Sequence, residues 1–165
     1  MKKKIICLSV VTIMISTVLW FINIRKIPIK VPKTTILING KEYKTVLGER
    51  LWLSKSQIKK GGSSFLVAPN EAFNKCSFIE ANSNNILNFK TDHLNKSEQI
   101  FLSYSDTSEN PYENKYEIKK DYEYVDNNNC QIILPNKEGY YYYSLSIKWD
   151  DTHAAEYFFK VEIIG

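Results

Sequence analysis

The last 27 residues of the chain, Gly139 to Gly165, alternate between apolar and polar positions. A period of two is typical of a β-strand with one buried and one solvated face. In the first half of this stretch, the predicted buried residues are Tyr141, Tyr143, Leu145, Ile147 and Trp149. The predicted solvent-facing residues are Tyr140, Tyr142, Ser144, Ser146, Lys148 and Asp150. Four consecutive tyrosines are therefore expected to divide into two buried and two exposed side chains.

The second half repeats this pattern after a turn predicted at DDTH, residues 150–153. Here the predicted buried residues are Ala155, Tyr157, Phe159, Val161 and Ile163. Glu156, Lys160 and Glu162 are expected on the opposite face. Together the two halves predict an antiparallel hairpin of two long strands.

A second hairpin is predicted over Thr34–Leu47, because the dipeptide Asn39-Gly40 accepts the positive φ angles of a type I′ turn. Between the two hairpins, the pattern predicts strands at 50–54, 84–90 and 99–105, a poorly buried strand near 116–125, and one helical turn at 68–73. No helical period longer than about two turns follows the apolar N-terminal run. The pattern therefore predicts an all-β domain.

Residues 5–24 carry no charged side chain and have the length of a helix that crosses a bilayer. Bulky residues from Val18 to Ile22 occupy the place where a signal peptidase requires small ones, so we expect an uncleaved anchor. The predicted organisation is a cytoplasmic tail at 1–4, a transmembrane signal anchor at 5–24, a short stalk at 25–33 and an extracytoplasmic β-sandwich domain at 34–165. This places the protein in the cell membrane as a single-pass protein.

The formal net charge of +4 belongs to the N-terminal end of the chain. Seven of the 22 Lys and Arg precede Thr34, which leaves 15 basic against 18 acidic residues in the predicted domain. Because this domain is mildly acidic, we expect no nucleic-acid partner. The short tail with its three lysines is expected to stay in the cytoplasm, since long domains cross membranes largely regardless of their charge.

The entry to the C-terminal hairpin resembles the tyrosine corner of immunoglobulin-like sandwiches, because a turn and Gly139 place Tyr141 two residues before the inward Tyr143. Tyr143 stands where immunoglobulin domains carry their second cysteine, so the antibody-type disulfide is not expected. The hairpin also resembles the C-terminal pattern of a loose, uncharacterised family of Gram-positive (Firmicutes) envelope lipoproteins and membrane-anchored proteins. The residues that match this pattern are Pro135, Gly139, Tyr141, Tyr143, Leu145, Trp149, Ala155, Tyr157, Phe159, Val161 and Ile163. The resemblance implies an immunoglobulin-like antiparallel β-sandwich and no particular activity.

Cysteine and histidine residues give little sign of catalysis or metal binding. Cys76 and Cys130 either form a disulfide in an oxidising compartment or remain separate small side chains. A sortase-like transpeptidase requires a strand-end cysteine with histidine and arginine partners, and neither cysteine has that context. His93 and His153 are isolated in predicted turns, so we expect no metal and no cofactor.

The remaining candidate is a binding surface built from tyrosine, which offers a large rigid contact area with a polar tip. The candidate patch consists of Tyr140, Tyr142, Tyr122 and Tyr124. We expect a non-enzymatic binding or accessory protein of the bacterial envelope, with an envelope protein or a cell-wall glycan as its partner. The alternative is an envelope hydrolase or transpeptidase whose site is assembled from residues far apart in the sequence.

Overall fold

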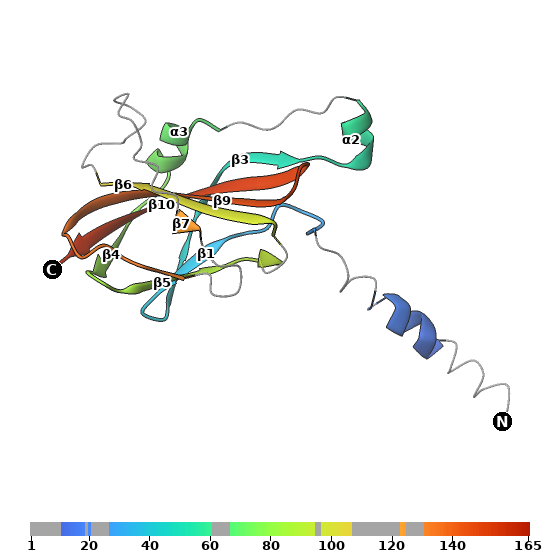
Figure 1. Ribbon diagram of the computed structural model, residues 1–165, viewed down its shortest axis with the longest axis horizontal. Coiled ribbons are helices and arrows are strands. Elements are labelled where there is room, and N and C mark those ends of the chain that lie inside the picture. The colour runs from blue at the N-terminus through green and yellow to red at the C-terminus, as the bar shows by residue number, and fades with distance from the viewer. Residues whose placement is uncertain are drawn as a thin grey trace.

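The structure is a computed structural model of the 165-residue chain. It describes residues 11–18, 20, 27–60, 67–94, 97–106, 123–124 and 131–165, of which 55, 123 and 124 are described by their backbone alone. The described part is mostly β-strand, arranged as two sheets packed face to face (Figure 1). The predicted all-β, sandwich-like architecture is confirmed.

The smaller sheet has four antiparallel strands in the order β2-β1-β5-β8. Their bounds are β1 Thr35–Ile38, β2 Lys41–Lys44, β5 Ile86–Lys90 and β8 Gln131–Ile133. The predicted type I′ turn joins β1 to β2, with positive φ angles of 51° at Asn39 and 77° at Gly40. Ile38 pairs directly with Lys41, which is the register that a two-residue turn imposes.

The larger sheet has six strands, of which five follow the order β3-β10-β9-β6-β7. Their bounds are β3 Val46–Trp52, β6 Gln99–Ser105, β7 Glu123–Tyr124, β9 Gly139–Asp150 and β10 His153–Ile164. The sixth strand, β4 (Phe78–Asn82), pairs in parallel with the last residues of β10. This pair departs from the purely antiparallel arrangement that the sequence predicts.

The long hairpin β9–β10 supplies the centre of the core. All ten residues predicted to be buried on its two strands are at most 4% exposed. Their face of the sheet packs against the inner face of the smaller sheet, as in the edge-to-face contact of Phe89 with Phe159 at 6.2 Å between ring centroids. The Tyr141 hydroxyl donates a 2.9 Å hydrogen bond to the Lys137 carbonyl oxygen, so the predicted tyrosine corner is present.

The opposite face of this hairpin differs from the prediction, because part of it is covered by a short helix. Tyr142 and Ser144 were expected to face water, but they are 7% and 3% exposed. Helix α3 (Pro69–Asn74) places Phe73 against the rings of Tyr142 and Phe158, with centroid separations of 5.3 and 4.8 Å. The period of two predicts only the face of the hairpin that packs against the smaller sheet. The opposite face is covered in part by α3, which comes from a distant part of the chain.

The side chains of Ala72, Phe73, Tyr142 and Phe158 form a second, smaller core cluster. Gly48 on β3 makes room for this second cluster. A Cβ atom built on Gly48 would collide with the Phe158 ring. A glycine inside a strand normally weakens it, but here the missing side chain allows the close approach of Phe158.

Residues 27–33 of the segment predicted as a stalk lie on the domain. Pro28 and Pro32 are buried, and the side chains of Ile27 and Val31 pack against the main core. The Tyr157 hydroxyl donates a 2.9 Å hydrogen bond to the carbonyl oxygen of Pro32. Residues 27–33 are therefore part of the folded domain.

The chain before this segment is described only at residues 11–18 and 20, which are helical. The remainder of the predicted anchor at 5–24 lies outside the described residues. Within the part of the chain that the structure covers, no helix combines the length and the apolar composition required to cross a membrane.

Replacing Tyr142 with alanine tests the second cluster. Because the ring packs between Phe73 and Phe78, Tyr142→Ala is expected to lower the free energy of unfolding by roughly 3–5 kcal/mol. The matched change Tyr140→Ala, at a residue that is 39% exposed, is expected to cost about 1 kcal/mol or less. Urea denaturation of both variants measures the difference, and equal small losses would contradict the covering role of α3.

Candidate functional site

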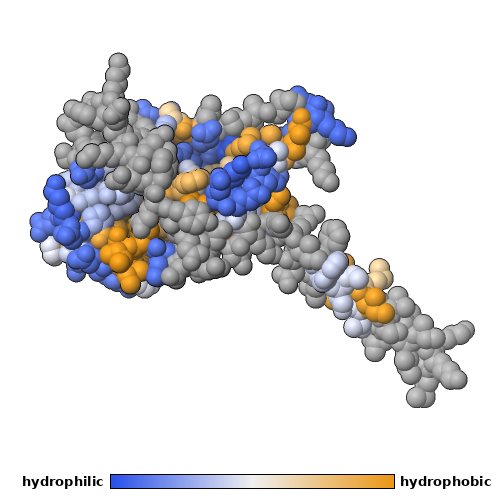
Figure 2. Space-filling model, viewed as in Figure 1, coloured by the Kyte–Doolittle hydropathy of each residue, from blue (hydrophilic) through white to orange (hydrophobic). Residues whose placement is uncertain are grey.

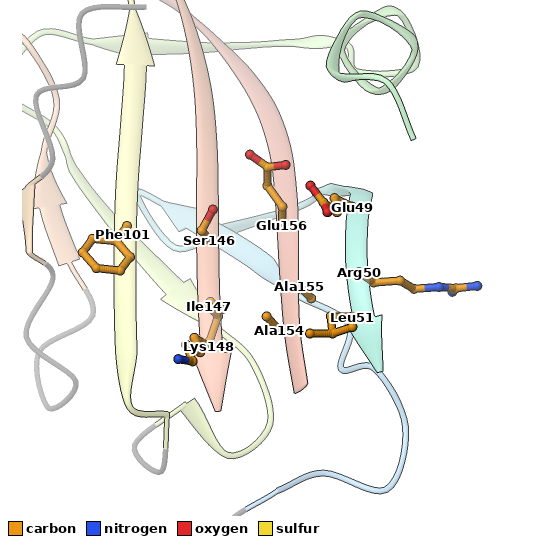
Figure 3. A pocket seen from close by; sticks show the side chains of 10 residues that line it. All are labelled: Glu49, Arg50, Leu51, Phe101, Ser146, Ile147, Lys148, Ala154, Ala155 and Glu156. Carbon is orange, nitrogen blue, oxygen red and sulfur yellow. The ribbon is translucent and has the colours of Figure 1, made fainter. Parts of the chain in front are cut away.

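A groove lies on the outer face of the larger sheet, beyond the area that α3 covers (Figure 3). Its volume is about 330 Å³, and residues from β3, β6, β9 and β10 line it. Its lining includes Glu49, Leu51, Phe101, Ser146, Lys148, Ala154 and Glu156. The groove therefore crosses four neighbouring strands near the β9–β10 turn.

The strand register explains why these residues meet. Phe101 of β6 lies opposite Ser146 of β9, and Leu51 of β3 lies opposite Ala154 of β10. Directly opposed residues of an antiparallel pair share one face of the sheet. The floor of the groove is consequently a mixture of apolar side chains and one serine hydroxyl.

Glu156 is the central polar residue of the groove. Its carboxylate accepts a hydrogen bond from the hydroxyl of Ser144, which lies opposite Phe158, two residues further along β10. Burial raises the pKa of the Glu156 carboxyl above its usual range, against the lowering effect of the Ser144 hydrogen bond, and the negative charge of Glu49 raises it further. The two carboxylates are therefore close enough to repel each other.

The basic residues of the groove do not neutralise these carboxylates. Lys148 is 2.6 Å from Asp151, measured from Nζ to Oδ1, and that ion pair raises the pKa of Lys148. Arg50 extends past the edge of the sheet, away from the groove (Figure 3). Among the described residues, no salt bridge involves Glu49 or Glu156. The groove is thus an open, partly apolar surface with acidic character.

The described lining of the groove offers carboxylates and a hydroxyl, but no thiol and no group of metal ligands. No group of three or more His, Cys, Asp or Glu that could hold a metal ion occurs in the described part of the chain. Neither histidine nor cysteine occurs among the described residues that line the groove. One feature of the groove is also found in enzymes that use a general acid: a carboxyl group with a raised pKa next to a second carboxylate.

Of the predicted tyrosine patch, only the side chains of Tyr140 and Tyr142 are described, and both pack against Phe78. Tyr140 is 39% exposed and packs edge to face against Phe78, whereas Tyr142 is buried, so its predicted exposure is wrong. The side chain of Tyr124 is not described, and Tyr122 lies outside the described residues. Tyr140 stands near the start of β9, and the groove lies toward the other end of that strand.

Cys76 carries a free thiol next to α3. Its Sγ donates to the carbonyl oxygens of Ala72 and Phe158 at 3.3 and 3.4 Å, and burial raises the thiol pKa to about 11. A thiol with this pKa is a poor nucleophile at neutral pH. Cys130 lies outside the described residues, so the disulfide between the two cysteines stays a prediction.

Both histidines take part in local structure. The Nδ1 atom of His153 lies 2.9 Å from the Asp150 carboxylate in the β9–β10 turn, and its ring packs edge to face against Trp52. The carbonyl oxygen of His93 accepts a 3.2 Å hydrogen bond from the Trp149 indole nitrogen.

The sequence indicates that Glu156 lies on the outer face, but it does not indicate a groove. Glu49 reaches the same place through the pairing of β3 with β10, at a bulge between Ala155 and Tyr157 where the register shifts. The only signal in the sequence is a glutamate between apolar neighbours on a strand, which is common on exposed faces. The groove could therefore be identified only from the three-dimensional pairing of the strands.

Comparisons of this chain with protein-family models, with curated proteins and with solved structures gave no match.

Substituting Glu156 tests the electrostatics of the groove. The folded protein holds the Glu156 proton more tightly than the unfolded chain, so the associated stability is present at acidic pH and is lost as pH rises through the raised pKa. Glutamine carries no charge and retains an oxygen that can accept from Ser144. We expect Glu156→Gln to raise the melting temperature at about pH 7 and to have less effect at about pH 4.

Thermal denaturation across this pH range measures the effect, with Glu80→Gln, at an exposed position of β4, as the control for removing one charge from the same face. A Glu156→Gln variant that is less stable than the parent at about pH 7 would show that the carboxylate is favourably placed.

Proposed function

We propose that this protein is a single-pass, membrane-anchored module of a Gram-positive cell envelope, with an extracytoplasmic immunoglobulin-like domain that binds a partner without catalysing a reaction. The groove around Glu156 is the proposed contact site. The partner is an envelope protein or a cell-wall glycan that offers a basic group to the acidic lining. No cofactor is part of this proposal.

The immunoglobulin-like assignment is supported by the tyrosine corner. The hydrogen bond from Tyr141 to Lys137 closes the turn that leads into β9, and β9 is a central strand of the larger sheet. The core residue Tyr143 follows two positions later and stacks on Phe159, at 4.8 Å between ring centroids. Two packed sheets with this corner are the features that immunoglobulin-like sandwiches share.

The anchor is supported by the surface of the N-terminal helix. The large apolar side chains of residues 11–18 and 20 are between 50% and 64% exposed, so they do not pack into the domain. A water-soluble domain gains nothing from such a helix, whereas a bilayer accepts apolar side chains on every side and requires the backbone to be hydrogen-bonded internally. The uncharged run at 5–24 has the composition that this role requires.

The binding role depends mainly on one observation, which is the unequal covering of the larger sheet. The first part of the outer face is closed by α3 over Tyr142 and Phe158, and the part beside it remains an open groove with two carboxylates. An exposed concave area that combines apolar floor and convergent polar groups is the usual form of a binding site.

Site-specific photo-crosslinking in cells tests this role. A photoreactive amino acid in place of Lys148, at the rim of the groove, is expected to capture one discrete partner. The same amino acid in place of Ile133, which is 69% exposed on the smaller sheet, is the control and is expected to capture none. Identical capture from both positions, or none from Lys148, would contradict the assigned contact site.

The alternative function is an envelope hydrolase that uses Glu156 as a general acid, favoured only by the raised pKa beside Glu49. The two functions differ in a simple assay. Incubation of the full-length protein with purified cell walls would release soluble fragments if the chain is a hydrolase, and none if it only binds.

A further inference from the structure

We infer that one end of the domain rests on the surface of an anionic lipid bilayer. This end, the N-proximal end, consists of residues 27–33, the β9–β10 turn and helix α2 (Lys55–Lys59). The inference depends on the proposed anchor, and it adds that the domain is held in a fixed orientation against the membrane.

The chain between the proposed anchor and the domain is short. The uncharged run ends at Ile24, and the part of the chain that packs on the domain begins at Ile27. Two residues between them span at most about 11 Å, because successive Cα atoms are 3.8 Å apart. With the anchor in the bilayer, the N-proximal end therefore cannot move far from the headgroups.

Residues 27–33 are attached to the core of the domain. The buried Pro28 and Pro32, and the hydrogen bond from Tyr157 to Pro32, hold them on the sandwich. The Thr91 hydroxyl adds a 3.4 Å hydrogen bond to the Lys33 carbonyl oxygen. A short connection to a docked segment restricts rotation of the domain more strongly than a connection to a free stalk.

Helix α2 lies at the same end of the domain as residues 27–33. The Leu53 amide donates a 3.1 Å hydrogen bond to the Thr152 carbonyl oxygen, which ties the chain before α2 to the β9–β10 turn. Trp52 packs edge to face against Trp149, and Trp149 donates to His93, which lines the same hollow as residues 28–33. Figure 1 shows α2 and the N-terminal segment at the same end of the sandwich.

The N-proximal end presents exposed apolar and basic side chains. Ile29 is 77% exposed and Ile58 on α2 is 46% exposed. Four exposed lysines accompany them: Lys30, Lys33, Lys59 and Lys60. Figure 2 shows hydrophilic and hydrophobic side chains adjacent to each other over α2. Isolated large apolar side chains among lysines are typical of surfaces that sit at a membrane interface.

The acidic residues of the same end are largely engaged with other partners. Asp150 pairs with His153, and Asp151 pairs with Lys148. Asp92 lines the hollow beside residues 28–33, and the negative charge of Glu98 acts on Lys148. In contrast, none of the four lysines forms a salt bridge with another described residue. The charge that this end offers to a membrane is therefore positive.

A capping box fixes α2 where the lysines can act together. The Ser54 hydroxyl accepts from the Gln57 amide at 3.3 Å, and the Gln57 side chain accepts from the Ser54 amide at 2.9 Å. Such reciprocal bonds stabilise a helix of only five residues, which would not persist alone.

Fluorescence quenching by spin-labelled lipid tests the inference on the full-length protein in nanodiscs of phosphatidylglycerol and phosphatidylcholine. A fluorescent amino acid in place of Ile58 is expected to lose most of its emission when the lipids carry a doxyl group near the headgroup. The same amino acid in place of Ile133, which is 69% exposed and far from α2 in the fold, is the control and is expected to keep its emission.

A charge variant tests the lipid chemistry. Lys59→Glu with Lys60→Glu is expected to restore much of the emission at position 58. The matched variant Lys41→Glu with Lys44→Glu, on the exposed edge strand β2, is expected to leave the quenching unchanged. Equal quenching in phosphatidylcholine alone would overturn the requirement for anionic lipid.

The two proposals fail in different ways. If the protein does not enter nanodiscs, the anchor is wrong. If it enters but position 58 stays as bright as position 133, the anchor stands and the docked orientation is wrong.

Discussion

The pairing of β9 with β10 is the interaction on which the rest of the structure depends. Each strand has twelve residues, and their register runs from Gly139 opposite Ile163 to Asp150 opposite His153. The free edge of β9 receives β6, while the other edge of β10 receives β3 along its first half and β4 along its second. Both faces of this hairpin are also used, since one contacts the smaller sheet and the other contacts α3.

The division of the outer face follows from this arrangement. The short α3 covers Tyr142 and Phe158 but does not extend along the whole hairpin. Beyond it, Glu156 remains half-buried, and its burial together with the repelling charge of Glu49 raises the pKa of its carboxyl, against the lowering effect of the Ser144 hydrogen bond. Among the described residues no salt bridge compensates this carboxylate, and perturbed pKa values of this kind cluster at functional sites.

The parts of the fold that local sequence determines were predictable. The Asn39-Gly40 turn follows from two residues that accept positive φ, and the buried set on β9 and β10 follows from a period of two. The tyrosine corner was predictable for the same reason, because Tyr141 reaches a carbonyl oxygen only four residues away.

The parts that depend on distant segments were not predictable. The burial of Tyr142 requires Phe73, the groove requires Glu49 beside Glu156, and the docking of residues 27–33 requires Tyr157. A strand pattern reports whether a face is apolar, and it cannot report which helix or loop covers the other face. The tyrosines at 140 and 142 look alike in the sequence, and only the position of α3 separates them.

Native-state hydrogen exchange measures the central role of the β9–β10 hairpin most directly. Backbone amides from Tyr142 to Leu145 lie between two neighbouring strands and under two layers of side chains. The account predicts that they exchange only through global unfolding, with an exchange free energy equal to the unfolding free energy from denaturant titration. Exchange of these amides as fast as that of edge strand β2 would contradict it.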